Sequence, residues 1–439
     1  MSNFFNLEEN GTNIRTECIA GITLFISVSY ILVLNPEILA STGLPRDQLY
    51  TATALVAAIS TLLMGWYANQ PLAMAPGMGI NALFAYGLVQ GQGMSVAEAL
   101  TAALFSGIIF FILSLFGLRT FLKAAIPNVI KLSCMAGIGI FIAYIGLKNS
   151  GIIVSSPATF ITLGNITTAS TAIPLAGLIL LGFLLRGHNK AAALITIVAI
   201  TITTWILGIA EAPDFSALFS MPAMPTDIIL NFDFSKVGSI SFMTAVMSLL
   251  FFDLLDTTGT LLGISRASGV RDEEGDIFAS RRALQVDAGS TVLSSVLGSS
   301  PATVYVESAL APQSGGQTGL VAIVVGMLFL GSLFIEPFFS AIPGQASAPV
   351  LIAVGAVLMR GAADIKWNRI EHIIPAFFTI VGMALTFSIA NGLSLGIISY
   401  AILNSFPGKN ANIEDKVSIQ TYILSGLLAA YLIVYNTGL

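Results

Sequence analysis

Long apolar stretches, separated by short polar segments, recur along the whole chain. A helix of about 20 apolar residues crosses the hydrocarbon core of a bilayer, so each stretch predicts a transmembrane segment. The windows of spanning or near-spanning length are 19–40, 51–68, 74–91, 97–117, 129–147, 172–186, 190–209, 241–264, 283–299, 301–311, 317–340, 346–360, 373–405 and 418–436. This pattern predicts an all-α polytopic membrane protein with about 14 transmembrane segments.

Two of these windows are poor as simple helices. Window 74–91 begins MAPGMGINA, with a proline and two glycines, and window 301–311 is short and begins PATVYV. Irregular backbone at membrane depth is tolerated only where it lines a cavity or is buried in protein. Two such segments in corresponding positions of the two halves indicate an inverted repeat with its binding site near the midplane. The pattern is therefore that of a transporter.

The charges of the connecting loops predict the orientation. With a cytoplasmic N-terminus, the outer loops hold only Arg46, Lys148 and Lys236. The inner loops hold Arg119, Lys123, Lys131, Arg186, Lys190, Arg266, Arg271, Arg281, Arg282, Arg360, Lys366 and Arg369. An excess of basic residues marks the cytoplasmic side, so we expect the N-terminus there, in the plasma membrane (the inner membrane of a bacterium).

The last hundred residues do not follow this rule simply. Lys409 and Lys416 fit the orientation poorly if window 373–405 is one span. Ala390-Asn391-Gly392 would split that window into two half-helices. The sequence leaves both topologies open.

Composition excludes several classes of function. Only 9% of the residues are charged and 55% are hydrophobic, whereas soluble proteins average about 25% charged residues. The net charge of −5 leaves no basic patch for nucleic acid. Two cysteines and two histidines without ligand spacing argue against a metal or haem centre. We therefore expect no metal and no cofactor.

Carboxylates inside the apolar windows are the candidate chemistry. FFDLLDTTGTLLG carries Asp253 and Asp256, three residues apart and so on one face of a helix. Glu307 follows the irregular PATVYV segment. A charge at the bilayer centre costs about 3 kcal/mol on insertion scales, so each acid needs a partner, a wet cavity or a function. Asp256 and Glu307 are expected to accept hydrogen bonds from a flat heterocycle held by free backbone groups of the broken segments.

Other polar and aromatic positions leave alternatives open. Asp253 either supports Asp256 or faces a polar crevice, and Asp287 lies either on a proton path or at the interface beside Arg281 and Arg282. Asn81 either hydrogen-bonds the ligand or caps the helix after the glycines. Phe84 and Tyr305 either wall the ligand or pack in the core. Thr257, Thr258 and Thr260 either offer hydroxyls or bond back to their own helix.

These segments resemble the nucleobase–cation symporter family, within the xanthine/uracil permease superfamily, and most closely its adenine/guanine/hypoxanthine permease branch. The similarity covers nearly the whole chain and includes NGTNIRTECIAGITLFISVSYILVLNPEIL, ANQPLAMAPGMGINALFAY, AGIGIFIAYIGLKNSGIIV, FFDLLDTTGTLLG, VDAGSTVLSSVLGSSPATVYVESA and GGQTGLVAIVVG. Gln317, where this branch usually has arginine, and Leu310-Ala311-Pro312 depart from the pattern.

The resemblance implies a seven-plus-seven inverted repeat with short β-strands in spans three and ten. The implied parts are a cytoplasmic N-terminus (1–18), a core domain (19–124 and 240–342) and a gate domain (125–239 and 343–439). It implies that Asn81, Asp256 and Glu307 bind the substrate and that backbone groups around Gly79 and Val306 complete the pocket. It also implies proton-driven purine uptake and a homodimer formed through the gate domain.

Proton coupling is expected to involve Asp253, Asp256, Asp287 and Glu307. Sodium coupling is the alternative, although the sequence offers no evident oxygen-rich sodium site. The rival functions are an anion transporter of the same plan, which the clustered acids disfavour, and an intramembrane aspartyl enzyme. Asp253 and Asp256 share one helix, whereas an aspartyl dyad is expected on two, so we expect no catalytic residues. The preferred purine is not specified by the sequence.

Overall fold

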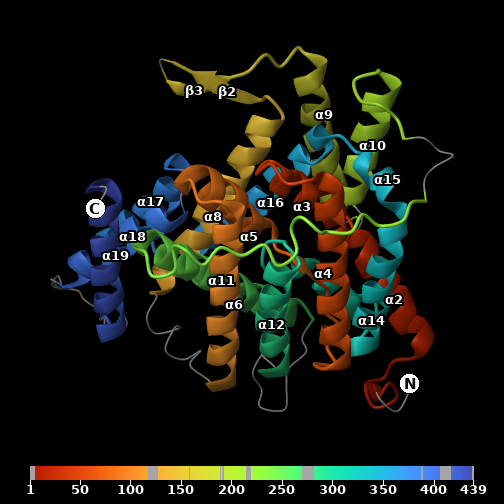
Figure 1. Cartoon of the computed structure of the whole chain (residues 1–439), viewed down its shortest axis with the longest axis horizontal. Coiled ribbons are helices and arrows are strands. Elements are labelled where there is room, and N and C mark those ends of the chain that lie inside the picture. Colours follow the sequence, from red (N-terminus) through yellow and green to blue (C-terminus); the bar gives the residue numbers. More distant parts are fainter. Residues whose placement is uncertain are drawn as a thin grey trace.

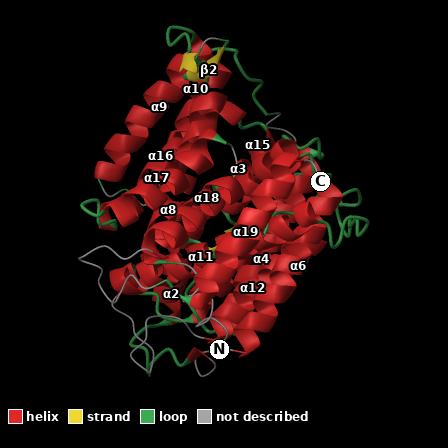
Figure 2. Ribbon diagram, turned by 90° about the vertical axis from the view of Figure 1, so that its left-hand side faces the viewer, coloured by secondary structure: helices red, strands yellow, loops and turns green. Residues whose placement is uncertain are grey.

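The computed structural model describes residues 5–116, 127–157, 159–187, 189, 192–213, 219–268, 281–386, 389–405 and 417–437. Helices make up most of these residues, and Figure 1 shows them running between two ends of the molecule. The N-terminus lies at one end. The strands β2 (Ile153–Ser156) and β3 (Phe160–Leu163) and the adjoining ends of α9 (Ala169–Arg186) and α10 (Ala192–Ile206) lie at the other, as Figure 2 shows from the side.

The first half of the chain contains α2 (Ile14–Val28), α3 (Ile31–Ala40), α4 (Arg46–Trp66), β1 (Met74–Pro76), α5 (Met78–Ala82), the π-helix η1 (Leu83–Gly91) and α6 (Val96–Phe116). It continues with α8 (Asn128–Asn149), β2 (Ile153–Ser156), β3 (Phe160–Leu163), α9 (Ala169–Arg186) and α10 (Ala192–Ile206).

The second half contains α11 (Ile240–Ser268), α12 (Arg281–Val296), β4 (Ala302–Val304), η3 (Val306–Ala309), α13 (Leu310–Gln313), α14 (Gly319–Ser332), η4 (Leu333–Ile335) and α15 (Glu336–Ser340). It ends with η5 (Gly344–Ala346), α16 (Ala348–Leu358), η6 (Met359–Asp364), α17 (Ile370–Leu385), α18 (Ile389–Ser405) and α19 (Ile419–Thr437).

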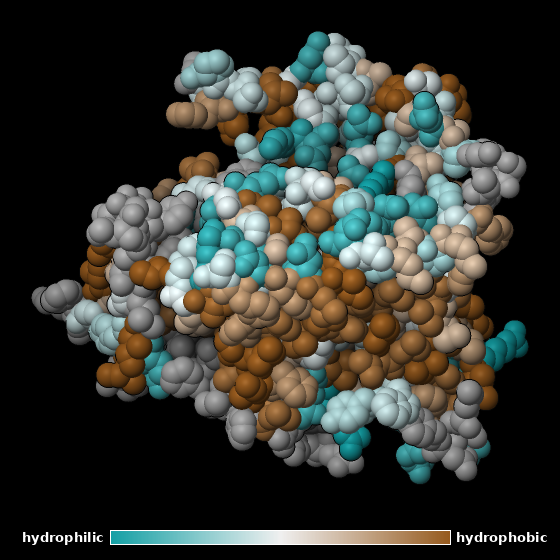
Figure 3. Space-filling model, viewed as in Figure 1, coloured by the Kyte–Doolittle hydropathy of each residue, from teal (hydrophilic) through white to brown (hydrophobic). Residues whose placement is uncertain are grey.

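The molecule is a multi-pass membrane protein. Within the described residues, seven helical stretches are long and apolar enough to cross a bilayer. They are Ile14–Ala40, Arg46–Trp66, Val96–Leu115, Asn128–Asn149, Ala169–Arg186, Gly319–Phe339 and Gly344–Asp364. Figure 3 shows apolar side chains in a broad band across the face of the molecule, with hydrophilic side chains gathered above it.

The two irregular segments meet inside the bundle. β1 and β4 lie within the third and tenth expected windows and pair antiparallel, with Met74 opposite Val304 and Pro76 opposite Ala302. The ladder continues at both ends, where the N–H of Gly77 donates to Pro301 O at 3.1 Å and that of Tyr305 to Ala73 O at 3.0 Å. Hydrogen bonding between the segments thus satisfies backbone groups that lipid could not.

The helices form two packing groups. In one, α14 packs on α4 and α2, and α12 packs on α4 and α6, which also contacts α11. In the other, α8 packs on α16 and α17, and α9 packs on α10 and α16. The strand pair joins the two irregular segments of the first group and faces the second group across a cavity.

Window 373–405 contains two helices. Gly392 of α18 faces Met383 of α17, and Gly396 faces Thr379, so residue numbers fall along one helix as they rise along the other. The hairpin returns the chain at Ser405 to the end of the molecule where α17 began. Lys409 and Lys416, outside the described residues, therefore follow a helix ending on the side of Arg369. With two helices in this window, Lys409 and Lys416 no longer conflict with the orientation that loop charge predicts.

We expect the hairpin to depend on its small residues. A Cβ at Gly392 would collide with the Met383 side chain and with its backbone nitrogen, which cannot move aside easily. Overpacking of this kind costs about 1–3 kcal/mol, so Gly392→Ala should lower the melting temperature of the purified protein. Gly182→Ala in α9 is the control, because nothing lies within 4 Å of its Cβ position. Equal melting temperatures for the two variants would contradict this packing.

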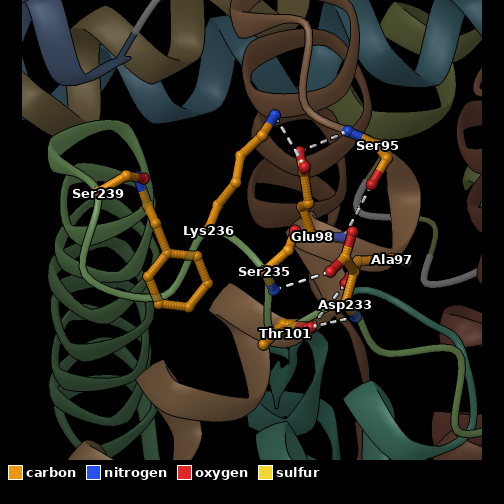
Figure 4. A network of polar contacts seen from close by, with 9 residues as sticks. Ser95, Ala97, Glu98, Thr101, Asp233, Ser235, Lys236 and Ser239 are labelled. Carbon is orange, nitrogen blue, oxygen red and sulfur yellow. Dashed lines mark hydrogen bonds and ion pairs between the residues drawn. The ribbon is translucent and has the colours of Figure 1, made fainter.

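A polar network fastens the segment before α11 to the first turn of α6 (Figure 4). Glu98 accepts a hydrogen bond from the N–H of Ser95 at 3.0 Å and pairs with Lys236 at 2.8 Å. The N–H of Asp233 donates to Thr101 Oγ1 at 2.9 Å. The N–H of Ser235 donates to the Asp233 carboxylate, which lowers the pKa of that carboxyl. The network fixes where α11, the helix carrying Asp253 and Asp256, begins.

Candidate functional site

A cavity of about 480 Å³ lies between the two packing groups. Its polar wall comes from the first group and includes Tyr30, Gly77, Met78, Gly79, Phe252, Asp256, Thr260, Thr303, Val304, Tyr305 and Glu307. Its opposite wall is mostly apolar and comes from α8, α9, α10 and α16, with Cys134, Met135, Ile138, Ile142, Leu181, Leu185, Ala193, Val350, Ala353, Val354, Val357 and Leu358. Cavities of this size and composition suit small organic ligands.

Two carboxylates stand on the polar wall, each held by one hydroxyl. Tyr30 Oη donates to Glu307 Oε1 at 2.9 Å, and Thr303 Oγ1 donates to Asp256 Oδ2 at 3.0 Å. No ion pair joins either acid to a lysine or arginine among the described residues. Each carboxylate therefore keeps capacity to accept hydrogen bonds from a ligand in the cavity.

The strand pair explains why these acids come together. Thr303 lies in β4 and Glu307 in the 3₁₀ turn η3 that follows it, so both come from the irregular segment that pairs with β1. Asp256 reaches the same wall from α11. Each strand is only three residues long and gives way to a helical turn, from which Met78 and Glu307 line the cavity.

Three other predicted residues lie in the cavity wall. Tyr305 Oη donates to Pro76 O at 2.6 Å, which holds its ring against the cavity, and Thr260 lines the wall beside Asp256. Gly79 allows close approach, because a Cβ there would collide with the Phe252 ring. Val306 is the first residue of η3, between Tyr305 and Glu307, but its side chain lies outside the described part of the structure.

Asn81 and Phe84 do not line this cavity. Both are fully buried, Asn81 against Asn35 and Phe84 within the main apolar core. The expectation of direct contact with a ligand thus differs from their placement in this conformation. Asn81 lies one turn into the helix that begins after Gly77, and that turn directs its side chain behind the wall.

Asp253 and Asp287 lie behind the polar wall in a crossed arrangement. Thr291 of α12 donates to Asp253 of α11 at 2.6 Å, and Thr257 of α11 donates to Asp287 of α12, also at 2.6 Å. Both acids are fully buried, and one oxygen of each has no hydrogen-bond partner. Asp287 thus lies inside the protein, and the Thr257 hydroxyl bonds to it rather than to its own helix.

Sequence reasoning missed several residues of the site, and three of them are polar or charged. Tyr30 and Thr303 are the donors to the two carboxylates, and Arg360 of η6 lines the end of the cavity furthest along α16. Tyr30 stands in a continuous apolar run, where a hydroxyl beside an expected intramembrane acid was an available signal. Arg360 was considered only as a loop charge. Within the described residues, no cluster of histidine, cysteine and acidic side chains could hold a metal ion.

A comparison with protein-family models finds a match over most of the chain. The model of the xanthine/uracil permeases, described as the Permease family, matches residues 15–395. The chain belongs to this family. It is therefore a transporter and not an enzyme.

Named relatives agree with this family. The chain is 42% identical to a permease of Methanocaldococcus jannaschii, covering 99% of this chain and 98% of that protein. It is 37% identical to the guanine/hypoxanthine permease PbuO of Bacillus subtilis, covering 94% and 97%. It is 35% identical to the adenine permease AdeP of Escherichia coli, covering 94% and 93%.

Solved structures show the same fold at much lower identity. The transmembrane domain of the cyanobacterial bicarbonate transporter BicA matches with a TM-score of 0.59 and 16% identity, covering 89% of this chain and 96% of that one. The murine anion transporter Slc26a9 in its inward-facing state matches with a TM-score of 0.62 and 12% identity, covering 91% and 72%. These neighbours define the transporter fold of this permease.

Proposed function

We propose that this permease carries a purine nucleobase into the cell together with a proton, by alternating access. The observation that carries the proposal is the pair of carboxylates, Asp256 and Glu307, on one wall of a cavity whose opposite wall is mostly apolar. A purine presents ring and exocyclic N–H groups in one plane, and carboxylates accept such groups strongly. The names of the relatives, adenine permease and guanine/hypoxanthine permease, support the same ligand class.

The cavity walls suit a flat ligand. The rings of Tyr305 and Phe252 border the polar wall, and the apolar side chains of α8 and α16 border the other. A planar base would stack its faces against these surfaces while its edge meets Glu307 and Asp256. Asn81, expected at this edge, would act from behind the wall.

We assign the two packing groups to the core and gate domains of a fourteen-span, seven-plus-seven transporter. The strand pair lies in the core, and helices α8, α9, α10 and α16 belong to the gate. The cavity extends from the strands to Leu185, Ala193 and Arg360, at the ends of α9, α10 and α16. Loop charge predicts these ends to be cytoplasmic, so this conformation would release the base inward.

The crossed pair of Asp253 and Asp287 is our proposed proton site. Two buried carboxylates on facing turns, without a described cation between them, cannot both carry charge cheaply. One of them therefore holds a proton in this conformation. Asp256, three residues from Asp253 on the cavity side, would link the binding of the base to the loss or gain of that proton.

An anion transporter is the second candidate, because Arg360 lines the cavity and the solved neighbours carry anions. Arg360 is exposed, whereas Asp256 and Glu307 are partly buried on the opposite wall. An inorganic anion would have to sit beside Glu307 and Asp256 without a compensating cation, so the site favours a neutral base.

Thermal stabilisation separates these candidates. We expect adenine, guanine or hypoxanthine to raise the melting temperature of the detergent-purified protein at pH 6, and uracil and bicarbonate to leave it unchanged. A ligand at 100 times its Kd adds about 2.7 kcal/mol to the free energy of unfolding. Stabilisation by bicarbonate and by none of the purines, at pH 6 or 8, would replace this proposal with the anion transporter.

A further inference from the structure

Asn35 occupies a position that neither the proposed ligand contacts nor the proton site explains. It lies in α3, is fully buried, and its side-chain amide contacts residues from three other parts of the chain. Its Nδ2 donates to Thr53 Oγ1 at 2.8 Å and to Ser299 Oγ at 3.1 Å. Its Oδ1 accepts from Asn81 Nδ2 at 3.1 Å and from Ser300 Oγ at 3.3 Å. One amide thus connects both irregular segments.

The orientation of this amide follows from a chain of donors and acceptors. The Thr53 hydroxyl donates its single hydrogen to Leu49 O at 2.6 Å. Thr53 Oγ1 therefore faces Asn35 as an acceptor, and the group of Asn35 that meets it must be the NH₂. The opposite group of Asn35 is then the carbonyl oxygen.

The same reasoning extends one residue further, to Asn81. Because Asn35 presents its carbonyl oxygen, Asn81 must present its NH₂ there. The carbonyl oxygen of Asn81 then points away from Asn35, and it is buried without a hydrogen-bond partner. A buried acceptor without a partner is costly, by about 1–3 kcal/mol, so this atom is suited to a donor that the described residues do not supply.

We propose that Asn35 is a positioning residue which, through the relay Leu49–Thr53–Asn35–Asn81, makes Asn81 a hydrogen-bond acceptor for the transported base. This inference rests on the proposed function. Asn81 lies in the same short turn as Gly77, Met78 and Gly79, which line the cavity. In this proposal a movement of the turn brings the Asn81 oxygen to an N–H of the ligand. The sequence left Asn81 both a donor and an acceptor; the relay turns its NH₂ toward Asn35 and leaves its carbonyl oxygen as the group without a partner.

A double-mutant cycle tests the relay by titrating adenine and guanine against the purified full-length protein. We expect Asn35→Leu to weaken purine binding by about tenfold, and Asn81→Ala by a similar factor, since a hydrogen bond contributes about 0.5–1.5 kcal/mol. Residues that act through one another are not additive. The double variant should therefore bind no more weakly than Asn81→Ala. An undiminished tenfold effect of Asn35→Leu in the Asn81→Ala background would overturn the proposal.

A second pair of variants covers the case in which Asn35→Leu does not fold. Thr53→Val removes the acceptor that sets the amide orientation, whereas Thr53→Ser keeps it. Thr53→Val should weaken binding several-fold and Thr53→Ser should bind as the wild type does. Equal binding by these two variants would also overturn the relay. If adenine, guanine and hypoxanthine all fail to bind the wild-type protein, the proposed function itself fails, and the inference fails with it.

Discussion

Glu307→Gln should abolish purine uptake while leaving the protein folded. The carboxylate is expected to accept an N–H from the base, and the amide would turn a donor group toward the same edge of the ligand. A loss of about 100-fold in transport corresponds to about 2.7 kcal/mol. Losing a hydrogen bond to a charged acceptor, and leaving an unpaired donor in its place, can account for a free-energy change of this size. The measurement is uptake of radiolabelled adenine and guanine by cells producing each variant.

The control for this variant is Glu371→Gln. Glu371 pairs with Arg369 at 2.6 Å at the start of α17, outside the cavity. Glu371 does not line the cavity, so uptake by this variant should stay near that of the wild type. Wild-type uptake by Glu307→Gln, at equal protein level, would remove Glu307 from the binding site.

Asp287→Asn should separate binding from accumulation. The substituted side chain keeps an oxygen for the Thr257 hydroxyl, so the packing of α11 on α12 should survive. The variant cannot release a proton at this position. We therefore expect purines to stabilise the purified variant as they stabilise the wild type, while concentrative uptake driven by a pH gradient falls to the level of vesicles without a gradient.

The matched control is Asp227→Asn, at an aspartate that accepts a hydrogen bond from Gln48 on an exposed surface. It should leave both binding and gradient-driven uptake unchanged. Gradient-driven accumulation by Asp287→Asn would place the proton elsewhere, with Asp253 and Asp256 as the groups to test next. Sodium-driven uptake in proteoliposomes without a proton gradient would contradict proton coupling altogether.

Composition and apolar spacing predicted the membrane-protein class, and proline and glycine in two windows predicted where the backbone would be irregular. The acids Asp256 and Glu307 could be found because charge at membrane depth is costly. Their partners could not be found in this way. Tyr30 and Glu307 are 277 positions apart in sequence, and only the tertiary fold brings them together.

Other features depended on packing rather than on local pattern. In window 373–405, Ala390-Asn391-Gly392 suggested a break, but these residues lie inside α18, and the chain reverses before Ile389. The two helices then pack closely at Gly392 and Gly396, a contact that hydropathy did not reveal. The sequence also did not show in which direction a side chain points from a short helical turn. For this reason Asn81 and Asp287 were recognised as polar residues of interest but could not be placed behind the cavity wall.

The contrast between the two cavity walls has an evolutionary consequence. The polar wall belongs entirely to one packing group, and the other group supplies mostly aliphatic surface together with Arg360. Substitutions in Val350, Ala353 or Val354 would change the shape of the space without touching the acids. Related permeases can therefore differ in the size of the ligand they accept while keeping Asp256 and Glu307 unchanged.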